Sequence, residues 1–153
     1  PAPALRRDCA GPGEYPRRVV EIRVTYEGGL RTRAVHGPSG RELVTDAPLD
    51  NHGRGESFSP TDLVATALAT CMLTIMGIAA EKHGWSLAGA TATVVKRMQT
   101  APERKIAALE VVIRVPGGHG ERARAVLEQA ARGCPGHRTL HSAVAMPVRF
   151  EWA

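Results

Sequence analysis

The chain has 153 residues, about the size of one compact domain, with 43% hydrophobic and 23% charged residues. This composition excludes a disordered, collagen-like or disulfide-dense protein. The net charge is +5, but the basic residues occur as scattered pairs beside acids, and aromatic residues make up only 4%. The pattern indicates a solvated basic surface and argues against a nucleic-acid-binding protein.

The first 18 residues are rich in Pro, Gly and Arg and lack the apolar core of a signal peptide. We therefore expect a flexible arm over residues 1–18, a single domain over 19–153, and a cytoplasmic location. Three cysteines, an odd number, argue against a structural disulfide framework. Cys9 lies in the arm and is predicted to be a bystander.

A three-stranded β-meander is predicted next. Residues 19–26 alternate between apolar and polar, which predicts a half-buried strand with Val20, Ile22, Val24 and Tyr26 on its inner face. A Gly-Gly turn leads to its hairpin partner, and a second turn leads to a third short strand. These two strands are expected at 30–36 and 41–45, followed by a loop over 47–57.

Ser59 and Pro60 predict the start of a helix, because Ser is a favoured N-cap and Pro suits the first helical position. The helix should continue to about His83 and end at Gly84. Residues 63–80 carry no charge, and a stretch of this length is the minimum for a membrane span. Their threonines and alanines, with no flanking basic or aromatic belt, favour instead a helix buried on all sides within a soluble domain.

The second half predicts two more strands, an amphipathic helix over 121–132 with Ala123, Leu127 and Ala130 on one face, and a last strand. Pro147 places that last strand at a sheet edge or a bulge. The strands are expected at 87–98, 104–115 and 144–152. The order βββ-α-ββ-α-β predicts an α+β fold with mostly antiparallel pairing around a buried central helix.

Two cysteines are the residues most able to carry chemistry. Cys71 lies within the apolar helix, where burial disfavours a thiolate, so it is either a small core residue or needs a cation nearby. Cys134 precedes Pro135 and can be the N-cap of a short helix in an exposed setting, where the helix dipole favours a thiolate.

Several partners for these thiols remain open. Arg31 and Arg33 share one face of a predicted strand, and either solvent or a thiolate can be their neighbour. Asp62 and Glu56 flank the helix start and can orient an arginine or cap the helix. Alternatively, Cys134, His137 and His141, spaced i, i+3, i+7, form a possible metal site with Cys71 as fourth ligand.

The chain contains the motif Ser59-Pro60-Thr61-Asp62-Leu63 followed by Ala-Leu-Ala-Thr-Cys71, and a second motif, Cys134-Pro135-Gly136-His137-Arg138-Thr139-Leu140. Together these motifs resemble the OsmC/Ohr family of thiol-dependent hydroperoxide-reducing proteins, in its OsmC-like branch. The DNHGRGESF loop and the Gly-Gly-Leu-Arg turn fit the same family. The resemblance extends over about residues 19–152.

The resemblance implies an intertwined α+β homodimer with active sites at the subunit interface. Cys71 corresponds to the peroxidatic thiol, Cys134 to the resolving thiol, and Arg31 to the activating arginine of the family. Peroxidase members commonly carry a Glu where this chain has Thr61, followed by Asp62. In this chain the pairing of the activating arginine with a carboxylate at the helix start is therefore shortened, shifted to Asp62 or absent.

The expected function is a cytoplasmic thiol peroxidase that reduces organic hydroperoxides through a Cys71 sulfenic acid and a Cys71–Cys134 disulfide. A small thiol or dithiol is the expected reductant, and no flavin, haem, metal or other cofactor is expected. Neither a nucleic acid nor a membrane is an expected partner. Two alternatives remain: a non-catalytic small-molecule or acyl-group binding protein on the same fold, and a Cys/His metal-binding protein.

Overall fold

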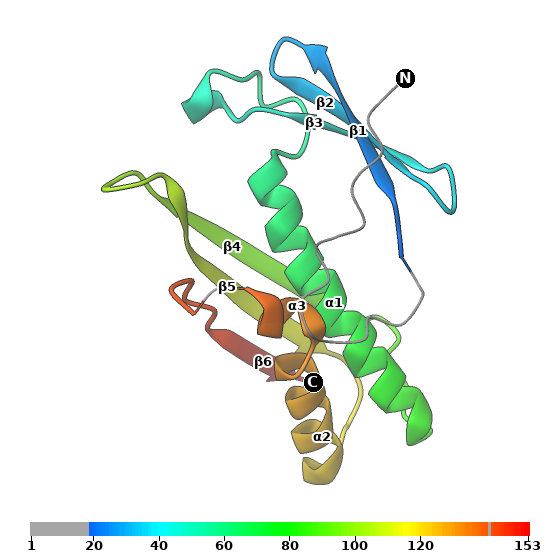
Figure 1. The fold of residues 1–153 in the computed structure, drawn as a ribbon. Coiled ribbons are helices and arrows are strands. Elements are labelled where there is room, and N and C mark those ends of the chain that lie inside the picture. Colours follow the sequence, from blue (N-terminus) through cyan, green and yellow to red (C-terminus); the bar gives the residue numbers. More distant parts are fainter. Residues whose placement is uncertain (1–18, 141) are drawn as a thin grey trace, which may run out of the picture. The chain divides into compact units, whose positions relative to one another are not determined.

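The computed structural model describes residues 19–140 and 142–153, in two compact units that divide between Val44 and Thr45. The first unit contains strands β1 and β2 and the beginning of β3; the second contains three α-helices and a separate three-stranded sheet. Figure 1 shows these elements in chain order. The mixture of two small sheets and helices confirms the predicted α+β class.

The first sheet is a meander of β1 (Ile22–Gly28), β2 (Arg31–His36) and β3 (Glu42–Asp46), in the order β1-β2-β3. β1 and β2 pair antiparallel around the Gly-Gly turn, as predicted. Gly28 and Gly29 have φ of 88° and 58°, a region that glycine enters without a steric penalty. This turn places Arg31 at the start of β2, opposite Gly28.

The prediction that the first strand is half-buried is wrong for the isolated chain. Ile22, Val24 and Tyr26 expose 59%, 62% and 64% of their surface, and nearly all of β1 is exposed. The alternation of apolar and polar residues correctly predicted a strand but did not predict its burial. The reason is that alternation specifies an apolar face without specifying what covers it.

The central helix α1 spans Pro60–Lys82 and begins where the sequence predicts. The backbone N–H of Ser59 donates to Asp62 Oδ2 at 2.8 Å, and the Asp62 N–H donates to Ser59 Oγ at 3.2 Å. This reciprocal pair is a capping box that satisfies backbone donors at the helix start. His83 is the C-cap, and Gly84 follows with φ of 68°, as the predicted stop requires. A 3-10 turn, η1 (Leu49–Asn51), lies in the preceding loop.

The prediction that α1 is buried on all sides is wrong. Leu68, Met72 and Met76 are fully buried, whereas Thr66, Thr70 and Thr74 are exposed. Each of these threonine hydroxyls donates to the carbonyl four residues earlier. An 18-residue window of α1 has a mean hydropathy of 2.1 and could cross a membrane by length and composition alone. Within the described residues α1 contacts β4, β5, α2 and α3, and 33% of that window is buried.

The second sheet has the order β4-β5-β6, formed by β4 (Thr91–Gln99), β5 (Lys105–Val115) and β6 (Val148–Trp152). β4 and β5 pair antiparallel, whereas β5 and β6 pair parallel. The alternation in β5 is confirmed, because every second residue from Leu109 to Val115 is buried. These side chains pack in one core with Leu68, Met72 and Met76 of α1 and with Leu127 of α2.

The strands predicted at 87–98 and 144–152 begin four residues later than expected. Residues 87–90 form a turn in which the Ala90 N–H donates to the Leu87 carbonyl, so β4 begins only at Thr91. Pro147 precedes β6, which lies at the sheet edge as predicted. Since proline has no N–H to donate, the regular strand begins only after Pro147. Before it, Ala145 forms an isolated bridge with Ala108, and the Pro147 carbonyl accepts from the Val111 N–H at 2.9 Å.

The helix α2 spans Glu121–Arg132, as predicted. Ala131, rather than the expected Ala130, is buried beside Ala123 and Leu127. The chain then turns into the short helix α3 (Pro135–Thr139), which contacts α1. Together α2 and α3 form the crossover that a parallel β5–β6 pair requires.

Candidate thiol site

The helix α3 brings the two predicted thiols together. Cys134 is the N-cap of α3, as predicted, and its Sγ accepts a hydrogen bond from the His137 N–H at 3.3 Å. Cys71 lies in the middle of α1 and accepts from the Gly136 N–H at 3.4 Å. The two thiols also interact with each other, and neither forms a disulfide.

The two thiols differ in exposure. Cys134 is fully buried, which corrects the expectation that it occupies an exposed setting. Burial raises the pKa of the Cys134 thiol, and its interaction with Cys71 raises it further, although the His137 N–H opposes the shift. Cys71 is partly exposed and packs at the margin of the core. Cys71 is therefore the more accessible of the two thiols.

Asp62 is engaged at the start of α1 by a lysine from the second sheet. Lys96 Nζ donates to Asp62 Oδ1 at 2.5 Å, to Thr61 Oγ1 at 2.8 Å and to Ser59 Oγ at 3.4 Å. Burial of Asp62 raises its pKa, but the hydrogen bonds from Lys96 and Ser59 outweigh this effect and leave the pKa of Asp62 below its usual value. The carboxylate is thus held in its charged form.

The sequence reasoning missed Lys96. A signal was present in β4, where Ala92, Val94 and Lys96 alternate with exposed residues and so share the inner face. Lys96 exposes only 17% of its side chain. A lysine at an inward-facing position needs an anionic partner, and Asp62 supplies one.

Asp62 and Cys71 point to different sides of α1. Positions 62 and 71 are nine residues apart, which is about two and a half turns at 3.6 residues per turn. Side chains separated by a half-integral number of turns project in opposite directions. The structure therefore brings Cys71 and Cys134 together but does not place Asp62 beside them.

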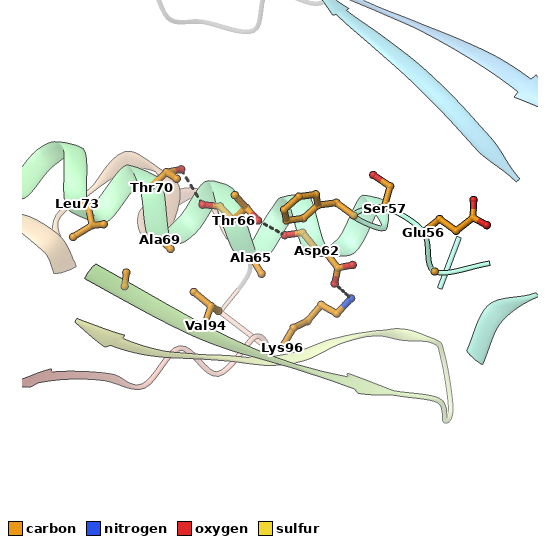
Figure 2. A pocket seen from close by; sticks show the side chains of 13 residues that line it. Glu56, Ser57, Asp62, Ala65, Thr66, Ala69, Thr70, Leu73, Val94 and Lys96 are labelled. Atoms are coloured by element: carbon orange, nitrogen blue, oxygen red, sulfur yellow. Dashed lines mark hydrogen bonds and ion pairs between the residues drawn. The ribbon is translucent and has the colours of Figure 1, made fainter. Parts of the chain in front are cut away.

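A groove of about 740 Å³ follows the Asp62 side of α1 (Figure 2). Ala65, Ala69 and Val94 contribute apolar surface, and the Asp62–Lys96 pair lies toward one end. Glu56 also lines the groove, and Figure 2 shows its carboxylate apart from the Asp62–Lys96 pair. Since Cys71 is not among the lining residues, this groove is separate from the thiol pair.

The two predicted arginines lie in β2 of the first unit. Arg33 forms ion pairs with Glu27 at 2.5 Å and with Glu42 at 2.7 Å, and these partners raise its pKa. Arg33 therefore has carboxylate partners within its own sheet. Arg31 is partly buried at the start of β2. Its assignment as the activating arginine stays a prediction.

No group of three or more His, Cys, Asp or Glu side chains suited to a metal ion occurs among residues 19–140 and 142–153. His137 lies in α3, but His141 of the predicted metal set falls outside the described residues. Cys9 also lies outside them.

Comparison with known proteins gives a consistent family match. Residues 53–149 match the family model described as OsmC-like protein. A crystal structure from Psychrobacter arcticus, described as a candidate osmotic-stress-induced and detoxification response protein, is 39% identical with a TM-score of 0.83 and covers 90% of this chain and 100% of that chain. None of the curated proteins compared with the chain matches it.

Two more distant structures share the fold. An organic hydroperoxide resistance protein OsmC from Legionella pneumophila is 17% identical, with a TM-score of 0.73 over 90% of this chain and 99% of that one. An organic hydroperoxide resistance protein from Elizabethkingia anophelis is 15% identical, with a TM-score of 0.74 over 92% of this chain and 100% of that one.

Proposed function

The chain belongs to the OsmC-like protein family, and we propose that it is a cysteine-based peroxidase that reduces organic hydroperoxides in the defence against oxidative stress. The observation that carries the proposal is the pairing of a partly exposed Cys71 with a buried Cys134. The organic hydroperoxide resistance proteins of the same fold support the substrate class.

In the first step, the Cys71 thiolate attacks the distal oxygen of the peroxide R–O–O–H, the one that carries the hydrogen. A sulfur–oxygen bond forms, the oxygen–oxygen bond breaks, and the departing alkoxide takes a proton to become the alcohol R–OH. Sulfur loses two electrons and becomes a sulfenic acid, and the peroxide is reduced by the same two electrons. The partial exposure of Cys71 allows a peroxide to reach its sulfur.

In the second step, the Cys134 thiol condenses with the sulfenic acid, giving a Cys71–Cys134 disulfide and one water. The proximity of the two sulfurs in the reduced protein supports this step. A small dithiol then reduces the disulfide and is itself oxidised to its disulfide, which returns both cysteines to thiols. The raised pKa of Cys134 keeps it protonated at neutral pH, which suits a resolving thiol better than an attacking one.

The proposal includes a homodimer in the cytoplasm. The apolar residues of β1, including Ile22, Val24 and Tyr26, are exposed in the single chain and supply a surface that a second copy can cover. Arg31 is assigned to the activation of Cys71, as the family resemblance implies. A guanidinium stays charged when buried and can both stabilise a thiolate and hold a peroxide oxygen.

The groove beside α1 favours a second candidate, a small-molecule binding protein without turnover. Its volume of about 740 Å³ and its apolar walls, including Ala65 and Val94, would suit an acyl chain. Such a protein binds its ligand without consuming peroxide.

The two candidates are separated by incubating the reduced protein with cumene hydroperoxide and a dithiol and following the loss of peroxide. We expect turnover by the wild type, none by Cys71→Ser, and a trappable sulfenic acid at Cys71 in Cys134→Ser. Peptide mapping after one equivalent of peroxide should show a Cys71–Cys134 link with Cys9 unlinked. Peroxide loss with the wild type no faster than with Cys71→Ser or with buffer alone would overturn the peroxidase and leave the binding protein as the better candidate.

A further inference from the structure

The first turn of α3 presents two successive backbone amides to the two thiols. The Gly136 N–H donates to Cys71 Sγ at 3.4 Å, and the His137 N–H donates to Cys134 Sγ at 3.3 Å. The Gly136 N–H also acts on Cys134, where it opposes the rise in the pKa of that thiol, so this amide is shared between the two sulfurs. Because α3 has only five residues, these directed hydrogen bonds matter here and not a helix dipole.

The contact at Cys71 depends on the absence of a side chain at Gly136. A Cβ built at this position would lie 3.3 Å from Cys71 Cβ and 3.4 Å from Cys71 Sγ. The distance to Cys71 Cβ is tighter than ordinary van der Waals contact and the distance to Sγ is at its lower limit, so a methyl group would displace α3 or the Cys71 side chain by a few tenths of an ångström. Gly136 does not have a positive φ, so its backbone conformation is open to other residues. The close approach to Cys71 is therefore what favours glycine here.

We propose that Gly136 is a catalytic residue of the thiol site, whose backbone N–H stabilises the Cys71 thiolate and whose missing side chain lets that amide reach the sulfur. This inference rests on the proposed peroxidase function and adds a second source of thiolate stabilisation besides Arg31. A hydrogen bond to a charged acceptor favours the charged form. The amide does not titrate, so it donates at every pH at which the protein is folded.

The same amide keeps the attacking sulfur next to its partner. Cys134 and Gly136 belong to one turn, so the hydrogen bond that holds Cys71 to Gly136 also holds it near Cys134. Of the titratable groups on α3 and its N-cap, Cys134 interacts with Cys71, and His137 and Arg138 follow within the same short helix. A test of Gly136 must therefore leave these three side chains in place.

Gly136→Ala meets this requirement, and Gly77→Ala is its matched control. Gly77 lies in α1, the helix that carries Cys71, but a Cβ there would meet no atom within 4 Å. The rate of Cys71 alkylation by iodoacetamide is measured against pH, with the modified peptide identified by mass spectrometry. We expect the pH midpoint to rise by about one unit in Gly136→Ala, which is about tenfold less thiolate at pH 7, and to be unchanged in Gly77→Ala.

A second measurement needs no substitution at Gly136. In protein labelled with 15N-glycine, the Gly136 amide proton should shift with pH at the midpoint found for Cys71 alkylation, and this response should be absent in Cys71→Ser. An unchanged alkylation midpoint in a folded Gly136→Ala, or a Gly136 amide that ignores the Cys71 titration, would overturn the proposal. If both results are as expected but the wild type consumes no peroxide, Gly136 stabilises the thiolate and the peroxidase proposal alone fails.

Discussion

The two sides of α1 use different chemistry to hold their functional groups. On one side, Asp62 and Lys96 form an ion pair with hydroxyl groups around it. On the other side, Cys71 accepts its hydrogen bond from the backbone N–H of Gly136. The comparison teaches that one apolar helix can carry a charged anchor at its first turn and a thiol two and a half turns later without the two sharing partners.

The difference also separates stability from reactivity. The Asp62–Lys96 pair connects the first turn of α1 to β4, so its loss should weaken the fold. The thiol pair connects α1 to α3, and its loss should change chemistry first. Variants on each side therefore test whether the two sides are independent.

The largest effect is expected in the contrast between the two thiols. In the native, reduced protein at pH 8, Cys71 should react with iodoacetamide on the order of a hundredfold faster than Cys134, because Cys134 is fully buried and its pKa is raised. Mass spectrometry of each peptide over time measures both rates. Equal rates in the native protein would show that α3 does not protect Cys134.

The next largest effect is expected from Arg31. Removing an opposite charge from beside a thiolate typically raises the pKa of the thiol by about one unit or more. Arg31→Ala should therefore lower the peroxidase rate about tenfold or more at pH 7. Steady-state peroxide consumption measures this effect.

Arg33→Ala is the control for Arg31→Ala, since the guanidinium of Arg33 pairs with Glu27 and Glu42 on its own sheet. We expect its rate to be nearly that of the wild type. If Arg31→Ala retained the full rate while Arg33→Ala lost it, the assignment of the activating arginine would pass to Arg33.

A smaller effect is expected on the charged side of α1. Lys96→Met removes the ammonium group but keeps much of the apolar stem, and it leaves the Asp62 carboxylate without its cation. Because Lys96 is largely buried and Asp62 is 40% exposed, we expect a loss of about 1–2 kcal/mol in the free energy of unfolding. Urea unfolding measures the loss. In the Lys96→Met variant, the ratio of Cys71 to Cys134 alkylation rates should stay as in the wild type.

Much of the fold could be predicted from local sequence signals. Ser59, Pro60 and Gly84 mark both ends of α1, and the Gly28-Gly29 turn marks the first hairpin, because capping and turn chemistry act over a few residues. Burial was harder to predict. An apolar alternation identifies the inner face of β1 only if something covers it, and within the described chain its apolar residues remain exposed.

The site was predicted in part. Cys71 and Cys134 were identified, and the N-cap position of Cys134 followed from Pro135. The burial of Cys134 and the partnership of Lys96 with Asp62 both depend on contacts between distant segments, which no local pattern encodes. The contact of Gly136 with Cys71 has the same origin, since a glycine after a proline usually indicates only a turn.

The smallest effect is expected from the pH dependence of the Asp62–Lys96 pair. The pKa of Asp62 is lowered in the folded protein, so its contribution to stability is fully present above the unfolded pKa, about 3.9, and is lost as the pH falls through the folded pKa. The difference in unfolding free energy between wild type and Asp62→Asn should therefore shrink as the pH falls below about 4. Its size should be below about 1 kcal/mol, because Asp62 is 40% exposed and solvent screens the pair.

In a Lys96→Met background, most of this pH dependence should disappear, since the strongest hydrogen bond to the carboxylate comes from Lys96. If the pH dependence survived without Lys96, the capping bond from Ser59 would be the main stabiliser of the Asp62 carboxylate.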